Sequence, residues 1–238
     1  MKFEATDKKY LAERKELSAK YGERELWSVI DHWPLYVGIA NLGRFMAIAD
    51  LFKEVSTVPG HVAEFGSWRG ANLMYMAKLL KLYDPHGEKL VHCFESFEGL
   101  STFVAQDETS NSTEGAYKGS YEELIDLIRL YDLQDDIVIH KGLIQDTLVP
   151  LLDSQKAMTF SFVYCDTDLY EPTKLILDSL HDRLAQGGLF VFDQWNDERW
   201  PGEGLAANEF LKEHKGEYEM LHIPAARQPT LAIRKITF

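Results

Sequence analysis

Three aspartates follow apolar segments of the chain at positions where their side chains could do chemistry. Asp166 comes directly after the segment FSFVYC, Asp168 stands two positions later, and Asp193 comes directly after GLFVF. If both segments are parallel strands, their carboxyl ends meet at one edge of a sheet, which is where open α/β sheets bind ligands. Grouped carboxylates repel one another unless a proton or a cation neutralises them, and oxygen-only ligands of this kind suit Mg²⁺, Ca²⁺ or Mn²⁺ rather than Zn²⁺. The pattern therefore predicts a metal site with acid–base chemistry beside it.

Asp168 also has a simpler interpretation. A helix is predicted to start near Glu171 and Pro172, because proline is favoured in the first turn of a helix, and Asp168 could cap that helix. Gln194, directly after Asp193, could offer a carbonyl oxygen to a metal, but it carries no charge and cannot act as a base.

A second group of candidate residues lies in the turn EFGSWRG, residues 64–70. Gly66 and Gly70 would let the backbone approach a ligand closely, and the N–H groups of such a turn can bind an anionic group. The alternative is that a tight strand-to-helix turn needs glycine for its own conformation. Glu95 ends the next apolar segment, where a nucleoside-binding domain places an acid for the ribose hydroxyls. The turn is not GxGxxG, so a dinucleotide is not predicted.

The elements that would position these residues are five short apolar segments. They are near-continuous rather than alternating, which is typical of parallel strands buried on both faces. The segments are HVAEF (61–65), KLVHCF (89–94), DIVIHK (136–141), FSFVYC (160–165) and GLFVF (188–192).

Helical segments alternate with these strands, at residues 72–83, 121–131 and 172–185. This order predicts an α/β fold with a doubly wound, Rossmann-like, mostly parallel sheet. Near the end of the chain, YEMLHIP and TLAIRKI are separated by a linker too short for a crossover helix, so we expect a C-terminal antiparallel hairpin.

We expect an N-terminal helical extension over residues 1–58 and a catalytic domain over 59–238. A helix over 3–26 is predicted to be exposed or to face a partner, and a second helix is expected to begin with Asn41 as its N-cap. Residues 100–120 are polar and turn-rich. A loop of this length is usually functional or disordered, and because this one follows directly after the C-terminal end of a strand we expect a lid insertion, with a floppy insertion as the alternative.

Composition narrows the function further. The net charge of −13 argues against a nucleic-acid or anionic-membrane surface. No stretch approaches the length of a membrane span, and the charged N-terminus lacks an apolar signal region. Cys93 and Cys165 lie inside predicted strands, as expected for reduced core residues of a cytoplasmic protein. The N-terminal aromatics, among them Trp27 and Trp33, predict a homodimer contact or a cover for the acceptor site, with packing on the chain's own core as the alternative.

The segments EFGSWRGANLMYMA, FESFEGL, KGLIQDTL, DTDLYEPT and GGLFVFDQW occur in the order and spacing of a known family. Over roughly residues 60 to 215 the chain resembles the macrocin O-methyltransferase (TylF-like) family of class I S-adenosylmethionine-dependent methyltransferases. Members methylate sugar hydroxyls, and many use Mg²⁺. The resemblance implies the same fold and activity here.

The resemblance also implies roles for individual residues. Cofactor binding would fall to the turn, to the acid after the second strand, to the region after the third strand and to one aspartate of the fourth: Glu64, Gly66, Ser67, Trp68, Gly70, Glu95, Ser96, Gly142, Asp146 and Asp166. The metal would be held by Asp166, Asp193 and Gln194. The family has Asp at the position of Glu95, and two adjacent acids where this chain has Asp193 and Gln194.

We therefore expect an S-adenosylmethionine-dependent O-methyltransferase that acts on a sugar hydroxyl, of a glycoside or a nucleotide-sugar, with help from Mg²⁺. Asp193 and Asp168 are the expected catalytic residues, the first as metal ligand and the second as base. His140 and His222 are alternative bases. Two other functions stay open: a metal-independent methyltransferase acting on an amine or a phosphorylated acceptor, which Gln194 favours, and a non-catalytic S-adenosylmethionine-binding protein.

Overall fold

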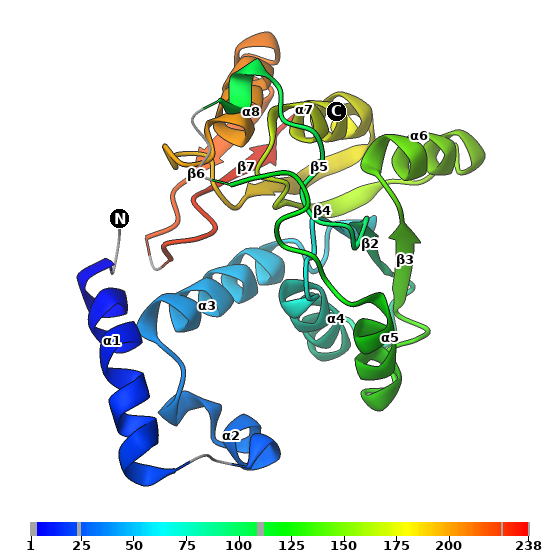
Figure 1. Ribbon diagram of the computed structural model, residues 1–238. Helices are drawn as coiled ribbons and strands as arrows, with labels where there is room; N and C mark the ends of the chain where they lie inside the picture. Colours follow the sequence, from blue (N-terminus) through cyan, green and yellow to red (C-terminus); the bar gives the residue numbers. More distant parts are fainter. Residues whose placement is uncertain (1–3, 23–24, 109–111, 225, 238) are drawn as a thin grey trace.

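One seven-stranded sheet organises the molecule, in the order β3-β2-β1-β4-β5-β7-β6 (Figure 1). The computed structural model describes residues 4–22, 25–108, 112–224 and 226–237. Strands β1 to β5 run parallel, whereas β7 is antiparallel to both β5 and β6. The strands are β1 (His61–Phe65), β2 (Val91–Glu95), β3 (Ile137–Lys141), β4 (Phe160–Cys165), β5 (Leu184–Phe192), β6 (Tyr218–Leu221) and β7 (Leu231–Lys235).

The mostly parallel sheet and its C-terminal hairpin are confirmed. One boundary differs: the helix expected over 172–185 ends at Leu180, and β5 already begins at Leu184. Residues 181–183 form a single 3₁₀ turn, η3 (His181–Arg183), and β5 contains Gly187 with a φ of 83°. The longer strand pairs Leu184 with Phe160 of β4, so tertiary pairing overrides the helical pattern at that end.

Helices cover both faces of the sheet. In Figure 1, α3, α4 and α5 lie below the sheet and α6, α7 and α8 lie above it. Each layer has its own apolar core, one around Phe52, Met76 and Phe162 and the other around Phe94, Ile176 and Phe190. These helices are α3 (Ile39–Glu54), α4 (Ala71–Tyr83), α5 (Tyr121–Leu130), α6 (Ile144–Ser154), α7 (Tyr170–Leu180) and α8 (Pro201–Glu213).

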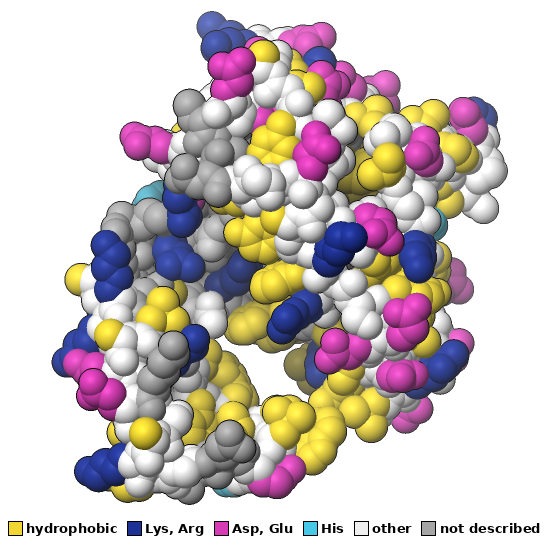
Figure 2. Space-filling view, viewed as in Figure 1, with side chains coloured by type: hydrophobic (Ala, Val, Ile, Leu, Met, Phe, Trp, Pro, Cys, Tyr) yellow, Lys and Arg dark blue, Asp and Glu magenta, His cyan; other side chains and the backbone are white. Residues whose placement is uncertain are grey.

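The N-terminal part stands away from this layered body. It consists of α1 (Glu4–Tyr21), α2 (Leu26–Asp31) and the 3₁₀ turn η1 (Trp33–Leu35). Apolar side chains border the opening between this arm and the body (Figure 2). Asn41 is not an N-cap, because the helix already starts at Ile39 after the extended residue Gly38. Within the described residues, no helix has the length and apolar character needed to cross a membrane.

Candidate active site

A cleft of about 400 Å³ opens at the carboxyl ends of the parallel strands. Its volume lies within the range of small-molecule sites. Most of the residues expected to bind ligands line it: Gly66, Trp68, Glu95, Ser96, Gly142, Asp166, Asp168, Asp193 and Gln194. Segments far apart in the sequence therefore meet at one edge of the sheet, as the strand-end argument predicts.

Four expected site residues do not line the cleft. Glu64 and Ser67 are buried behind the turn, where the Ser67 hydroxyl donates to Glu64 Oε2 at 2.6 Å. Asp146 is exposed in the first turn of α6, and its neighbour Gln145 lies in the cleft instead. Gly70 packs against Leu124. These four residues therefore support or flank the cleft rather than face it.

The two glycines of the turn have reasons within the protein itself. A Cβ on Gly66 would lie 1.9 Å from the backbone oxygen of Asp166, and a Cβ on Gly70 would lie 2.5 Å from Leu124 Cδ1. Both residues also have positive φ, at 84° and 80°. The need for a tight turn thus accounts for both glycines, although Gly66 also borders the cleft.

Within the described residues, no charged side chain pairs with Glu64, which is buried beside Ser67. Burial raises the pKa of Glu64 to about 7, while the hydrogen bond from Ser67 and the charge of Arg44 oppose the shift. Its carboxyl group stabilises the glycine turn by accepting the hydrogen bond from the Ser67 hydroxyl.

Glu95 joins the turn to the loop after β2. Its Oε2 accepts the Trp68 N–H at 2.9 Å, and its Oε1 accepts the Phe97 N–H at 2.8 Å. Oε1 also accepts from the Ser96 hydroxyl at 3.4 Å, whereas Oε2 has a second lone pair and can still accept from a hydroxyl in the cleft. This buried acid fits the ribose-binding role expected for it.

An arginine that sequence reasoning missed lies at the aspartate end of the cleft. Arg44 of α3 donates to Asp193 Oδ1 in a very short contact and to Asp166 Oδ2 at 3.2 Å. The buried Tyr164 hydroxyl also donates to Asp193 Oδ1, at 2.6 Å. Burial opposes charge on the guanidinium, but Asp193, Tyr164 and Asp166 raise the pKa of Arg44 well above its usual range. A charged side chain from outside the predicted motifs therefore bridges the two aspartates.

The carboxyl of Asp166 titrates above its ordinary range. Burial and then the charge of Asp193 raise the pKa of Asp166, and Arg44 opposes that shift. One guanidinium shared by two aspartates does not offset their burial and mutual repulsion completely.

Asp168 faces the cleft and does not cap α7. The helix begins at Tyr170, whose N–H donates to Asp107 Oδ1 at 3.0 Å. Asp168 has a φ of 64°, and its Oδ1 is buried with no hydrogen-bond partner in the described part of the chain. Burial, and then the charges of Asp193 and Asp197, raise the pKa of Asp168 to about 7. Such a group can take up a proton near neutral pH.

Glu203 of α8 supports this end of the cleft and was also missed. It is fully buried, and its Oε1 accepts the Gln194 N–H at 2.8 Å. Burial raises the pKa of Glu203 well above its usual range, with Asp193 and Asp168 adding to the shift. The segment PGEGLAANEF gives little amphipathic signal, so neither α8 nor its acid was assigned from the sequence.

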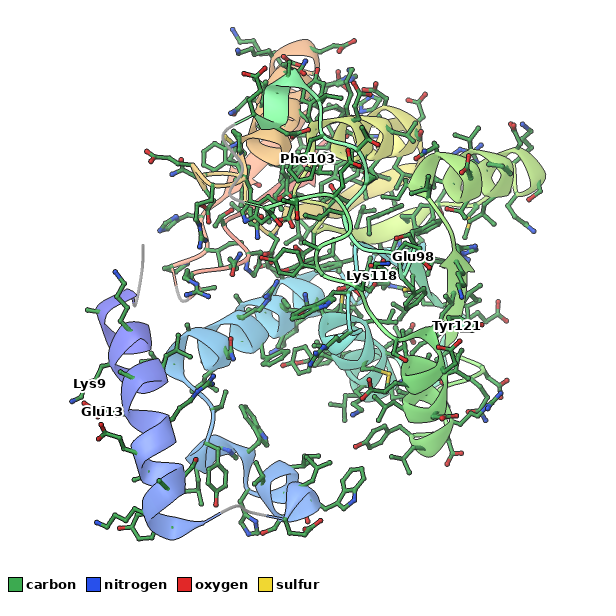
Figure 3. All side chains as sticks on the ribbon, viewed as in Figure 1. Lys9, Glu13, Glu98, Phe103, Lys118 and Tyr121 are labelled. Carbon is green, nitrogen blue, oxygen red and sulfur yellow. The ribbon has the colours of Figure 1, made fainter. Side chains whose placement is uncertain are left out.

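The expected lid, residues 100–120, is anchored at two points; residues 109–111 lie outside the described part. Near its start, Asp107 is buried and holds the N–H of Tyr170. Near its end, the Lys118 oxygen accepts from Trp68 Nε1 at 3.2 Å. Figure 3 shows Glu98 and Lys118 close together, and their charged groups are 3.1 Å apart. The segment thus connects the start of α7 with the glycine turn.

The aspartate end does not fit the Mg²⁺ that the sequence predicts. Asp193 Oδ1 already accepts two hydrogen bonds, and Arg44 occupies the space between Asp166 and Asp193. Among the described residues, only His181, His214 and Glu217 form a group of three acidic, His or Cys side chains with ligand atoms within 4.8 Å. They are not part of the cleft.

Comparisons with known proteins agree with this geometry. Residues 4–226 match the model of the family described as macrocin-O-methyltransferase (TylF). A relative from Streptomyces olivaceus, 8-demethyl-8-(2,3-dimethoxy-alpha-L-rhamnosyl)-tetracenomycin-C 4'-O-methyltransferase, is 28% identical over 170 residues, which cover 68% of this chain and 60% of the relative. Mycinamicin III 3''-O-methyltransferase of Micromonospora griseorubida is 28% identical over 177 residues, covering 70% and 66%. The chain thus spans less than two thirds of the length of these relatives.

Two solved structures of CalS11 share the fold. One, described as a calicheamicin methyltransferase, has a TM-score of 0.79 at 22% identity and covers 94% of this chain and 90% of that chain. The other is an apo form described as TDP-rhamnose 3'-O-methyltransferase, with a TM-score of 0.71 at 23% identity, covering 94% and 91%. The Rossmann-like architecture predicted from the strand order is therefore confirmed.

Proposed function

Because this chain belongs to the macrocin-O-methyltransferase (TylF) family, we propose that it is an S-adenosylmethionine-dependent O-methyltransferase acting on a sugar hydroxyl. The observation that carries the proposal is the position of Asp168. Its unpartnered Oδ1 is buried, and the residue lines the same cleft as Glu95 and the glycine turn. A base and a nucleoside-binding acid thus share one cavity.

The cleft has features that fit the cofactor. Glu95 can accept hydrogen bonds from ribose hydroxyls, and Trp68 and Gly142 border the space beside it. When bound, S-adenosylmethionine supplies an electrophilic methyl group on a positively charged sulfur. The roles of Glu95, Ser96 and Gly142 toward it are part of this proposal, and Gln145 takes the place expected for Asp146.

The remaining chemistry belongs to the chain's own side chains. The acceptor's hydroxyl oxygen attacks the methyl carbon in line with the breaking bond, so the cleft must align three atoms. The proton of that hydroxyl passes to the Asp168 carboxylate, whose raised pKa suits transfer near neutral pH. Asp193 is held by Arg44 and Tyr164 and acts as a positioning residue.

The acceptor is proposed to be a sugar, in a glycoside or in a nucleotide-sugar. The Streptomyces olivaceus relative is named for a rhamnosyl tetracenomycin, and CalS11 is described as a TDP-rhamnose 3'-O-methyltransferase. Arg199 and Arg227 line the cleft and add positive charge there, in a chain whose net charge is −13. An amine acceptor is less well supported, because a base with a free carboxylate oxygen is suited to a hydroxyl.

The test is a labelled-methyl screen of the purified full chain. Isotope-labelled S-adenosylmethionine is incubated with TDP-rhamnose, other nucleotide-sugars, rhamnosylated glycosides and simple amines, and products are identified by mass spectrometry. A sugar methyl ether is expected from the parent protein. Cofactor binding by calorimetry, with no methylated product from any acceptor, would favour the non-catalytic alternative.

Three further assignments belong to the proposal. The free, buried Cys93 and Cys165 support a reducing, cytoplasmic location. The arm, residues 1–38, exposes Leu26 at 62% and Leu35 at 77%, which supports a homodimer contact. The catalytic domain is proposed to include α3, since Phe52 belongs to its core.

The arm assignment has its own test. Removal of residues 1–26 should convert a dimer into a monomer in light scattering. A truncated protein of unchanged mass would restrict the arm to covering the acceptor site.

A further inference from the structure

The guanidinium of Arg44 lies between Asp166 and Asp193 at one end of the cleft. In a site built for a divalent cation, the carboxylate oxygens would surround a cation at about 2.0–2.6 Å. Here the Arg44 terminal nitrogen occupies that position and contacts one oxygen of each aspartate. An oxygen ligand that already accepts from Arg44 and from Tyr164 has no free direction toward a metal.

The residue expected as the third metal ligand, Gln194, also argues against a bound metal. Gln194 replaces an acid with a neutral amide, and its Oε1 is buried with no partner among the described residues. Two carboxylates beside one guanidinium carry a net charge of −1 when ionised. A dication added without loss of Arg44 would place two positive centres in contact, a costly arrangement in a buried site.

We propose that the guanidinium of Arg44 stands in for a divalent cation, so that methyl transfer by this chain needs no metal. This inference rests on the proposed function. Arg44 acts here as a positioning residue: it neutralises Asp166 and Asp193 and fixes their orientation beside Asp168. An arginine suits this task because its planar fork stays charged and can contact two carboxylates at once.

Two polar atoms at this end of the cleft lack hydrogen-bond partners within the described part of the chain. Arg44 Nε is buried and has no partner in the described residues, and neither has Gln194 Oε1. Both residues line the cleft. Because both atoms are buried, their side chains would have to shift toward the cleft to give an acceptor hydroxyl one donor and one acceptor, the orienting contact that a bound metal would otherwise make.

The first measurement compares parent activity in EDTA and in Mg²⁺, using the acceptor found in the screen. The two rates should agree within about twofold, since no step that depends on a Lewis acid is lost. A loss of tenfold or more in EDTA, restored by Mg²⁺, would overturn the proposal.

The second measurement removes the guanidinium. Arg44→Ala should lower kcat about a hundredfold in the absence of metal. Addition of Mg²⁺ should then raise the kcat of this variant at least tenfold, because Asp166 and Asp193 can hold the ion once the guanidinium is gone. Mn²⁺, observed by electron paramagnetic resonance, should bind Arg44→Ala and the shorter, neutral but polar Arg44→Gln but not the parent. Arg44→Lys should keep partial activity and show no rescue.

Controls keep the outcome decisive. Arg129→Ala removes an exposed arginine that pairs only with Asp126, and should change neither rate nor Mn²⁺ binding. Thermal unfolding identifies any variant that fails to fold, in which case Arg44→Gln carries the test. Mn²⁺ binding to the parent as tight as to Arg44→Ala would sink the idea. If no acceptor is methylated by any variant, the proposed function fails, while the Mn²⁺ measurement still decides the role of Arg44.

Discussion

The two halves of the cleft are built in different ways. The half proposed to bind the cofactor consists of turns directly after β1, β2 and β3, where the Glu95 carboxylate accepts the backbone N–H groups of Phe97, two positions away, and of Trp68, 27 positions away. The acceptor half depends on side chains from distant segments. Arg44 and Asp193 are 149 positions apart, and Asp107 and Tyr170 are 63 apart. Backbone geometry thus sets one half, and long-range charge and hydrogen bonding set the other.

The largest expected effect is in the acceptor half. Asp168→Asn should lower kcat about a thousandfold, because a positioned base contributes roughly that factor. Asparagine tolerates a φ of 64°, so the backbone should be unchanged. Calorimetry should show unchanged cofactor affinity. A parallel loss of cofactor binding would break the separation between the two halves.

The pH dependence sharpens the same assignment. The base must be deprotonated to work, and the pKa of Asp168 is raised to about 7. Activity of the parent should therefore fall about tenfold per pH unit below that value and level off above it. Glu64 has a similar pKa but lies outside the cleft, so Glu64→Gln should keep this limb of the profile. Its disappearance in Glu64→Gln would move the base assignment away from Asp168.

A glycine variant tests how rigid the cofactor half is. Gly66→Ala should lower the free energy of unfolding by about 3 kcal/mol, because its Cβ meets a backbone oxygen that cannot move aside. Gly216→Ala is the matched control, with a φ of 88° but nothing within 4 Å of the added Cβ. Urea unfolding compares the two. Equal losses would mean that the turn adapts, and the contrast drawn above would weaken.

The next largest effect is expected at Asp107, which anchors the 100–120 segment to α7. Asp107→Ala leaves the N–H groups of Tyr170 and Val104 without their partner and should cost about 2 kcal/mol. Hydrogen exchange should rise at the start of α7. Asp126→Ala, at an exposed position, should change neither. Unchanged exchange in Asp107→Ala would show that the segment is held elsewhere.

The smallest effect expected is in the cofactor half. Glu95→Gln replaces one acceptor oxygen with an amide NH₂ group that faces a backbone N–H. Because two donors then face each other, cofactor binding should weaken about tenfold, or 1.4 kcal/mol. Glu88→Gln, on the exposed approach to β2, is the control. Equal affinities for both variants in calorimetry would remove Glu95 from the binding site.

The same contrast explains what could be predicted from the sequence. Continuous apolar segments identify buried parallel strands, and the strand order then places Glu95, Asp168 and Asp193 at one edge, because connectivity alone fixes that geometry. Nothing local marks Arg44: it lies in an ordinary amphipathic helix before the first strand, and only folding brings it to Asp193. Glu203 was missed for a similar reason, since small residues around it hide the helix that carries it.

The position of Arg44 in α3 has a consequence for how such proteins are dissected. A fragment starting at residue 59 would retain every recognisable motif of the family, yet it would lack the helix that supplies the cleft's central cation and part of one core. Such a fragment would contain two facing aspartates and an exposed apolar sheet face. Domain boundaries chosen from motifs alone would therefore produce a protein that is prone to aggregate. Any metal binding by that fragment would result from the loss of Arg44 and would not be a property of the full chain.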